Sequence, residues 1–347
     1  MDDGAGVPSR TTGEGPALVD LASIEAAATS LPDGIRDSPA VYWDDGTWLK
    51  LENLQPTGSF KIRGALTKIS RIPLARRTAG VVAYSSGNHG IAVARAARMC
   101  GTTATVVVPE DAPRQKVSAI AREGAKVVSS APGSEQRRLI AEAIAAESGQ
   151  VLVPPYNDPD VIAGQGTIGI ELLRQVPHLL SVVVPVGGGG LISGIAAAVK
   201  ALRPSVKVIG VEPELAGDAR QALATGRLVQ WSAEEVGQTI ADGIRTQSLG
   251  ALNFAHVIRL VDDIVTVSDD DILDTAALLL HRRRIIAEPT GAVSLAAVVT
   301  GKVAADGAAV VISGANASAG VLQDLAVRAE RFENSPGQSV PRQGAYA

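Results

Sequence analysis

The chain contains 347 residues, of which 46% are hydrophobic and 20% charged, and its formal net charge is −4. This length exceeds what one ordinary core holds and predicts two domains, while the negative balance gives no indication of the basic face that nucleic-acid binding needs, so we expect no nucleic-acid partner. The single cysteine, Cys100, excludes an internal disulfide and favours a reducing compartment, for which we expect the cytoplasm. We expect no membrane partner either, because no stretch of 18 uncharged apolar residues occurs.

Both ends of the chain are predicted to be disordered. Residues 1–16 are acidic and rich in Gly and Pro, and they lack the basic and apolar regions of a secretory signal. Residues 331–347 are predicted to form a tail after one last helix.

Short β-rich apolar runs alternate with Ala-rich helical stretches, which is typical of an α/β fold. The first strands are predicted at residues 81–83, 103–108 and 126–129, with helices at 91–99, 115–123 and 134–147. Further strands follow at 182–186, 206–211 and 309–313, with helices at 191–202 and 269–284. We predict a small domain, residues 68–155, inserted into a larger domain formed by residues 17–67 and 156–330.

The first motif that carries chemistry is PTGSFKIRGA at residues 56–65. Its lysine, Lys61, follows a turn that contains glycine and lies between the apolar residues Phe60 and Ile62. Burial at such a place removes water from the amine, lowers its pKa and makes it a nucleophile. The alternative is a solvated surface lysine, which is what most lysines are.

The second motif is SSGNHG at residues 85–90, directly after a predicted strand and before a helix. The backbone N–H groups of such a loop, together with the helix N-terminus, bind anions such as a carboxylate. The alternative is an ordinary turn in which Ser or Asn caps the helix and His89 is structural.

The third motif is a run of four glycines after the predicted strand at 182–186. The four residues are Gly187, Gly188, Gly189 and Gly190. They let the backbone approach a phosphate group closely, and the following helix adds its dipole. The pattern matches neither GxGxxG nor a Walker loop, because Leu191 stands where the lysine would be. A tight turn is the alternative, although one glycine would be enough for it.

Together and in this order, the motifs resemble the fold type II pyridoxal-phosphate enzymes, specifically the serine/threonine dehydratase and serine racemase branch. The resemblance extends from about residue 51 to residue 316. It includes VIAGQGT at 161–167, TIADG at 239–243, EPTG at 288–291 and SGAN at 313–316. It implies a tryptophan synthase β-like fold, in which two open α/β domains hold pyridoxal 5'-phosphate between them.

The resemblance also implies a role for individual residues. Lys61 forms the Schiff base with the cofactor, and Phe60 packs near the cofactor ring. Asn88 hydrogen-bonds the phenolic oxygen, Ser313 faces the pyridine nitrogen, and Glu288 lies near the cofactor. The four glycines bind the phosphate. The substrate carboxylate is bound by the loop of Ser85, Ser86, Gly87, Asn88 and His89.

The implied activity is an ammonia-lyase, or dehydratase, that converts a small β-hydroxy amino acid to a 2-keto acid and ammonia. Threonine, serine and 3-hydroxyaspartate are the expected substrates, and Lys61 removes the Cα proton. Because the Ser313 hydroxyl cannot keep the pyridine nitrogen protonated, the ring is a weak electron sink and favours prompt loss of the β-hydroxyl.

The main alternative is a serine or aspartate racemase on the same scaffold. Ser86 stands where racemase-like members carry a second acid/base on the opposite ring face, so it is a candidate catalytic residue beside Lys61. Its other interpretation is a serine that caps the loop. A β-replacement synthase is more remote, because TIADG and SSGNHG favour the dehydratase branch. A non-catalytic binding protein is also remote, because Lys61 is retained.

The loop at residues 212–218, EPELAGD, resembles the divalent-cation site of this branch. Glu212 and Asp218 would supply carboxylates and Ala216 a backbone carbonyl, and these hard oxygen ligands suit Mg²⁺ or Ca²⁺. The alternative is a solvated acidic loop. The expected partners are a small amino-acid substrate and a second copy of the chain, in a homodimer.

Overall fold

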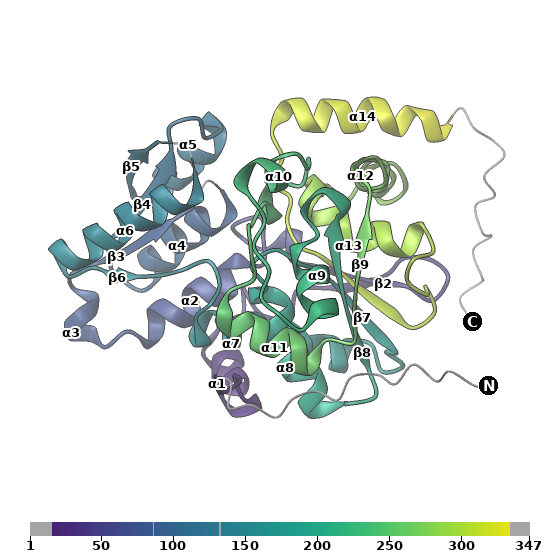
Figure 1. Ribbon diagram of the computed structural model, residues 1–347, viewed down its shortest axis with the longest axis horizontal. Coiled ribbons are helices and arrows are strands. Elements are labelled where there is room, and N and C mark those ends of the chain that lie inside the picture. Colours follow the sequence, from purple (N-terminus) through teal and green to yellow (C-terminus); the bar gives the residue numbers. More distant parts are fainter. Residues whose placement is uncertain (1–15, 86, 132, 334–347) are drawn as a thin grey trace.

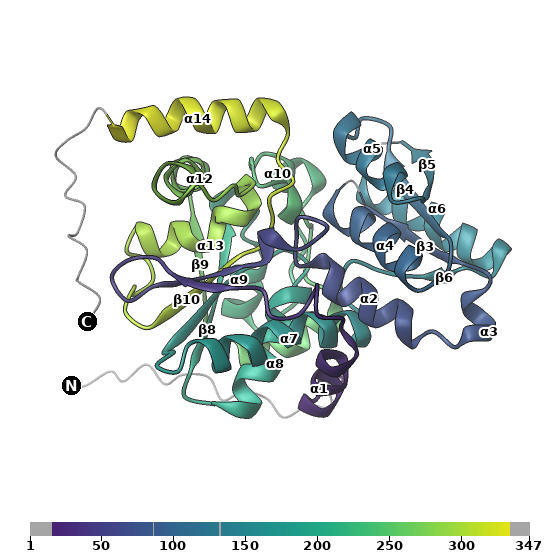
Figure 2. The ribbon, with the colours of Figure 1, turned by 180° about the vertical axis from the view of Figure 1, so that it is seen from behind.

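Two β-sheets, each covered by helices, organise the protein (Figure 1). This computed structural model describes residues 16–85, 87–131 and 133–333. The six-stranded sheet is assembled from segments far apart in the sequence, whereas the four-stranded sheet lies between Val81 and Leu152. Figures 1 and 2 show the two units side by side, with α2 (Lys61–Arg71) between them.

The six-stranded sheet has the order β1-β2-β10-β7-β8-β9, and only its β1–β2 pair is antiparallel. Its strands are β1 (Ala40–Tyr42), β2 (Trp48–Leu51), β7 (Ser181–Pro185), β8 (Lys207–Pro213), β9 (Asp263–Val267) and β10 (Ala308–Ile312). The central strands are buried along their length, which is why they read as continuous apolar runs in the sequence.

Helices cover both faces of this sheet. On one face lie α12 (Asp269–Arg283), α13 (Pro289–Val299) and α14 (Ala319–Glu333). On the other lie α7 (Pro159–Gln175), α8 (Gly190–Leu202), α9 (Asp218–Thr225) and α11 (Ala251–Leu260), and α1 (Leu21–Ser30) packs on α7 and α8. Successive side chains of a strand point to opposite faces. Val183 and Val310 therefore join the first core, and Val182 and Val311 the second.

The four-stranded sheet has the order β5-β4-β3-β6 and is entirely parallel. Its strands are β3 (Val81–Tyr84), β4 (Ala104–Pro109), β5 (Lys126–Ser130) and β6 (Val151–Leu152). Val81 and Ala83 pack toward α2 and α4 (Asn88–Met99), while Val82 packs toward α6 (Ser134–Ser148). The remaining short helices are α3 (Leu74–Arg77), α5 (Arg114–Arg122), α10 (Ala233–Gly237), η1 (Glu52–Leu54), η2 (Glu214–Ala216) and η3 (Asp242–Ile244).

The predicted α/β class with parallel sheets is confirmed, and each predicted strand and helix is present within three residues of its expected ends. The largest shift is at α4, which begins at Asn88, so SSGNHG supplies its first turn. The sequence did not predict α7, because its glycines lower helix propensity. Residues 331–333, expected in the tail, are helical; residues 1–15 and 334–347 lie outside the described residues. The domain boundaries stay a prediction.

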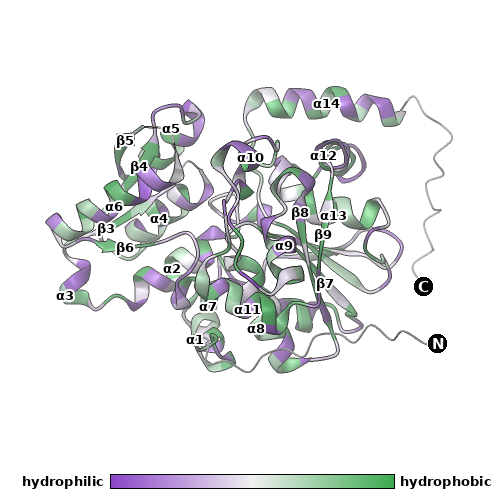
Figure 3. Ribbon diagram, in the orientation of Figure 1, coloured by the Kyte–Doolittle hydropathy of each residue, from purple (hydrophilic) through white to green (hydrophobic). Residues whose placement is uncertain are grey.

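Hydropathy follows this layering. Hydrophobic residues gather on the central strands, while α3 and α14 carry many hydrophilic ones (Figure 3). Within the part of the chain that the structure describes, no helix combines the length and apolar character needed to cross a membrane.

Candidate active site

The predicted site residues come together at the carboxyl ends of parallel strands. The glycine loop follows β7, Ser313 follows β10, and Ser85 follows β3. Loops at these ends form the usual binding crevice of open α/β sheets. A hollow of about 570 Å³ lies between the two units and reaches Glu288, but Lys61, Ser313 and the glycine loop do not line it. Its lining includes Ile91, Lys116, Asp242, Glu288 and Asn316.

Lys61 is the first residue of α2, and its side chain is half-buried. Its Nζ donates a hydrogen bond to the Pro155 carbonyl oxygen at 3.0 Å and lies 5.0 Å from the centre of the Phe60 ring. The Phe60 N–H donates to the Ser313 carbonyl oxygen at 3.2 Å, which ties the start of α2 to the end of β10. Burial lowers the pKa of the Lys61 amine to about 8, so part of it is uncharged and nucleophilic near neutral pH.

The glycine loop leads directly into α8, which begins at Gly190. Gly189 has a φ of +88°, a left-handed conformation that favours glycine. A Cβ atom at Gly188 would lie 2.3 Å from ring atoms of Tyr156, and one at Gly189 would lie 2.9 Å from Cβ of Asn253. Tyr156 and Asn253 thus leave no room for side chains on the loop, and its N–H groups lie at the positive end of α8, which suits a phosphate.

Asn88 is the first residue of α4 and is held by two polar neighbours. Its Nδ2 donates to Glu288 Oε1 at 2.5 Å, and its Oδ1 accepts from Asn316 Nδ2 at 2.7 Å. Burial raises the pKa of the Glu288 carboxyl to about 7, although the positive charge of Lys116 opposes this. A Cβ at Gly314 would lie 2.3 Å from Glu288 Oε1, so the SGAN motif keeps room for this carboxyl.

Ser85 and Ser313 each directly follow a strand. Ser85 Oγ accepts a hydrogen bond from the Gly87 N–H at 3.1 Å, which shapes the loop before α4. Ser86 lies outside the described residues. Ser313 is buried, and its Oγ lies 3.5 Å from the Thr290 carbonyl oxygen, a long contact that leaves the hydroxyl free to accept another partner.

His89 is buried, and its Nε2 lies 2.8 Å from the Val153 carbonyl oxygen. Burial first, and then the positive charge of Lys61, lowers the pKa of His89 to about 3. The imidazole is therefore neutral and donates its Nε2–H to Val153. Only its backbone N–H, in the first turn of α4, remains to bind an anion.

The predicted cation ligands lie beside the glycine loop, where β8 ends next to β7. Glu212 is buried, and its carboxylate accepts from the N–H groups of Ala219 at 3.0 Å and Arg220 at 2.8 Å. Asp218 begins α9, and its Oδ2 is buried with no partner among the described residues. Burial raises the pKa of both carboxyls, that of Asp218 to about 7. Ala216 is buried beside them in sequence.

Two residues of the site had no role in the sequence prediction. Asn316 donates to Asn88 and to the Thr57 carbonyl oxygen at 2.9 Å; its place at the end of the SGAN motif was the available signal. Tyr156 lies against Gly188 but belongs to none of the recognised motifs, so the sequence offered no signal for it.

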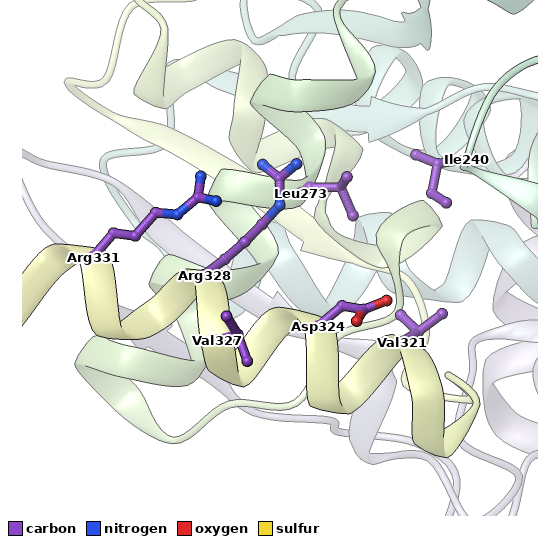
Figure 4. A pocket seen from close by; sticks show the side chains of 7 residues that line it. All are labelled: Ile240, Leu273, Val321, Asp324, Val327, Arg328 and Arg331. Atoms are coloured by element: carbon purple, nitrogen blue, oxygen red, sulfur yellow. The ribbon is translucent and has the colours of Figure 1, made fainter.

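A second hollow of about 340 Å³ lies along α14 and α12 and shares Ile240 and Val321 with the first hollow (Figure 4). It is lined by Ile240, Leu273, Val321, Asp324, Val327, Arg328 and Arg331. Arg328 pairs there with Asp270 at 3.0 Å and Asp274 at 2.7 Å, contacts that join α14 to α12. The hollow is a packing gap between helices and contains none of the predicted catalytic groups.

Known proteins share the sequence pattern and the fold of this chain. The sequence model of the family described as "Pyridoxal-phosphate dependent enzyme" matches residues 32–314. An L-threo-3-hydroxyaspartate ammonia-lyase of Saccharomyces cerevisiae is 44% identical over 249 residues, which are 72% of this chain and 76% of that protein. An L-threonine ammonia-lyase of Thermotoga maritima is 43% identical over 280 residues, 80% of this chain and 69% of that protein. The structure of maize serine racemase matches this chain with a TM-score of 0.82 and 33% sequence identity. The match covers 92% of this chain and 100% of the racemase chain.

Proposed function

Because the chain belongs to the family of pyridoxal-phosphate dependent enzymes, we propose that it is an ammonia-lyase that dehydrates a small β-hydroxy amino acid to a 2-keto acid and ammonia. The observation that carries this proposal is Lys61, a half-buried amine with a lowered pKa. Its Nζ donates to the Pro155 carbonyl oxygen, which would lie 3.6 Å from a Cβ atom at Gly190 of the glycine loop. The similarity to two ammonia-lyases supports the reaction type. Threonine, serine and 3-hydroxyaspartate are the proposed substrates.

The residues present fit pyridoxal 5'-phosphate. Lys61 offers an amine for the aldehyde, and Phe60 beside it offers an aromatic wall. The N–H groups of the glycine loop and the dipole of α8 offer a phosphate site. Asn88 would hydrogen-bond the phenolic oxygen, and the Ser313 hydroxyl would face the pyridine nitrogen. When bound, the cofactor withdraws electrons from the substrate Cα and makes its proton removable.

The chain's own groups then have simple tasks. Lys61 Nζ takes the Cα proton, for which its lowered pKa suits it. The substrate carboxylate binds to the Ser85–Gly87–Asn88 turn and the first N–H groups of α4, including that of His89. Glu288 orients the Asn88 amide by its 2.5 Å hydrogen bond.

We also propose a Mg²⁺ or Ca²⁺ site at Glu212, Asp218 and the Ala216 carbonyl. The unpartnered Oδ2 of Asp218 and the raised pKa of both carboxyls support it, because a cation would offset two buried negative charges. No group of three or more His, Cys, Asp or Glu side chains is placed for a metal within residues 16–85, 87–131 and 133–333, so water must complete the shell. A homodimer in the cytoplasm is proposed on the family resemblance and the single cysteine.

The deciding experiment is a screen for keto-acid release across β-hydroxy amino acids of both hands. We expect rapid release from at least one L-substrate and none from a Lys61→Ala variant. Borohydride should fix the cofactor on Lys61, since Lys50 is hydrogen-bonded on three sides and Lys68 is paired with Asp158 and Asp160. Label on either of those lysines, or no keto acid from any substrate, would overturn the proposal.

A racemase is the second candidate function, favoured by the similarity to maize serine racemase over 92% of the chain. Chiral analysis of the residual substrate separates the two activities. Accumulation of the D-enantiomer without keto acid would establish racemisation as the main reaction.

A further inference from the structure

Arg63 lies two residues after Lys61 on α2, and its guanidinium is completely buried. Residues two apart on a helix point to different sides, so Arg63 extends away from the cofactor lysine. The reaction proposed above gives it no chemical task. A cation buried this deeply is costly unless every donor is paired, so its surroundings need an explanation.

Two carboxylates clamp the Arg63 guanidinium. Glu52 accepts from Nε and from Nη2, both at 2.8 Å. Glu171 accepts from Nη1 at 2.6 Å and from Nη2 at 2.9 Å. Nη1 also donates to Thr167 Oγ1 at 3.0 Å, and Nη2 to Ser38 Oγ at 3.2 Å. A planar fork held on two edges is fixed in both position and rotation, which an ammonium group cannot achieve.

Lys50 on β2 completes this network. Its Nζ donates to the Ser38 carbonyl oxygen and to Glu171 Oε2, both at 2.6 Å, and to Gln175 Oε1 at 2.9 Å. The network therefore joins α2 to β2, to η1 and to α7. Its two cations and two carboxylates balance, so it holds α2 in place without adding a net charge near Lys61.

The helices beside the network touch backbone to backbone. A Cβ at Gly164 of α7 would lie 2.6 Å from the carbonyl oxygen of Arg63 and 2.7 Å from Cα of Gly64. A Cβ at Gly194 of α8 would lie 2.3 Å from the Ile162 carbonyl oxygen of α7. The glycines thus let α7 pack closely against both α2, which begins at Lys61, and α8, which begins at the glycine loop.

We propose that Arg63 is a positioning residue for Lys61. Clamped between Glu52 and Glu171, it fixes the first turn of α2 against β2 and α7, and so sets the place of the Lys61 amine relative to the glycine loop. The VIAGQGT motif serves the same purpose, because it supplies the glycine contact and Thr167. This inference rests on Lys61 being the cofactor lysine.

The test compares Arg63→Lys with Gln175→Leu in the holoenzyme. Arg63→Lys keeps the charge but loses the fork, whereas Gln175→Leu removes contacts from the far end of the network, with Lys50 and Ser38. Misplacement by about 1 Å costs about 10²-fold in rate, so we expect Arg63→Lys to lower kcat by roughly tenfold to a hundredfold, with KM changed by less than about threefold. The visible circular dichroism of the bound cofactor should weaken, because it reports a fixed orientation.

Gln175→Leu should lower the melting temperature yet keep the kcat and the dichroic band of the parent. If Arg63→Lys does not fold, Thr167→Val, which deletes one hydrogen bond to the guanidinium, should show the same split at a smaller size. The inference would be overturned if Arg63→Lys and Gln175→Leu lost the same share of kcat. It would also be overturned if kcat and the dichroic band were unchanged in Arg63→Lys or in Thr167→Val. Neither result would contradict the proposed function. A parent protein that binds no cofactor at Lys61 would overturn both the inference and the proposed function.

Discussion

Gly188 offers a sharp test of why the glycine loop contains glycine. An added Cβ would lie 2.3 Å from Cδ1 and Cε1 of Tyr156, far inside van der Waals contact. The Tyr156 side chain is half-buried and lies directly on the loop, so either the ring or the loop must shift to admit the added methyl group. Overpacking of this kind costs about 1–3 kcal/mol. We therefore expect Gly188→Ala to weaken cofactor binding by about fivefold to 150-fold.

The assay is a titration of cofactor-free protein with pyridoxal 5'-phosphate, followed by absorbance. Tyr156→Leu combined with Gly188→Ala should recover most of the lost affinity, because the smaller side chain vacates the space of the added methyl. Gly237→Ala is the matched control, since nothing lies within 4 Å of its added Cβ and its φ is not left-handed. A double variant that binds no better than Gly188→Ala alone would refute the reasoning and place the requirement for glycine on the phosphate side.

Three further predictions concern titration, metal and stereochemistry. In the cofactor-free protein, Glu288→Gln should remove a fall in stability between about pH 4.5 and 7: burial raises the carboxyl pKa to about 7, so the folded state keeps a proton that the unfolded state releases near 4.5. Melting temperatures of parent and variant that run parallel over that pH range would contradict it. Alanine at Glu212 and Asp218 should weaken activation by Mg²⁺ or Ca²⁺ while sparing the cofactor spectrum; a parent indifferent to chelator would exclude the site. Ser86→Ala should abolish any L-to-D conversion, a loss of about 10²–10⁴-fold, yet leave L-substrate dehydration largely intact at saturating substrate. An equal collapse of both activities would disprove the two-face assignment.

Much of the candidate site could be predicted because each of its motifs consists of residues that are neighbours in the sequence. The place of Lys61 between Phe60 and Ile62 predicts a desolvated amine, and burial lowers the pKa of this amine in the structure. The glycine loop could be predicted in the same way from its four consecutive glycines. In the structure, the left-handed conformation of Gly189 and the close contact of Gly188 with Tyr156 leave few alternatives to glycine. The parallel strands could also be predicted from the sequence, because burial on both faces produces uninterrupted apolar runs.

The sequence by itself thus determined the α/β class and the family resemblance, and it supplied the candidate reactive groups along the chain. Only the tertiary structure decided what surrounds them. The His89 imidazole hydrogen-bonds the Val153 carbonyl oxygen, and Tyr156 lies on the glycine loop. Arg63 is paired with both Glu52 and Glu171. The physical reason is that backbone conformation and periodicity are local properties, whereas these contacts join segments far apart in the chain. Their partners are selected only when the helices and sheets pack together.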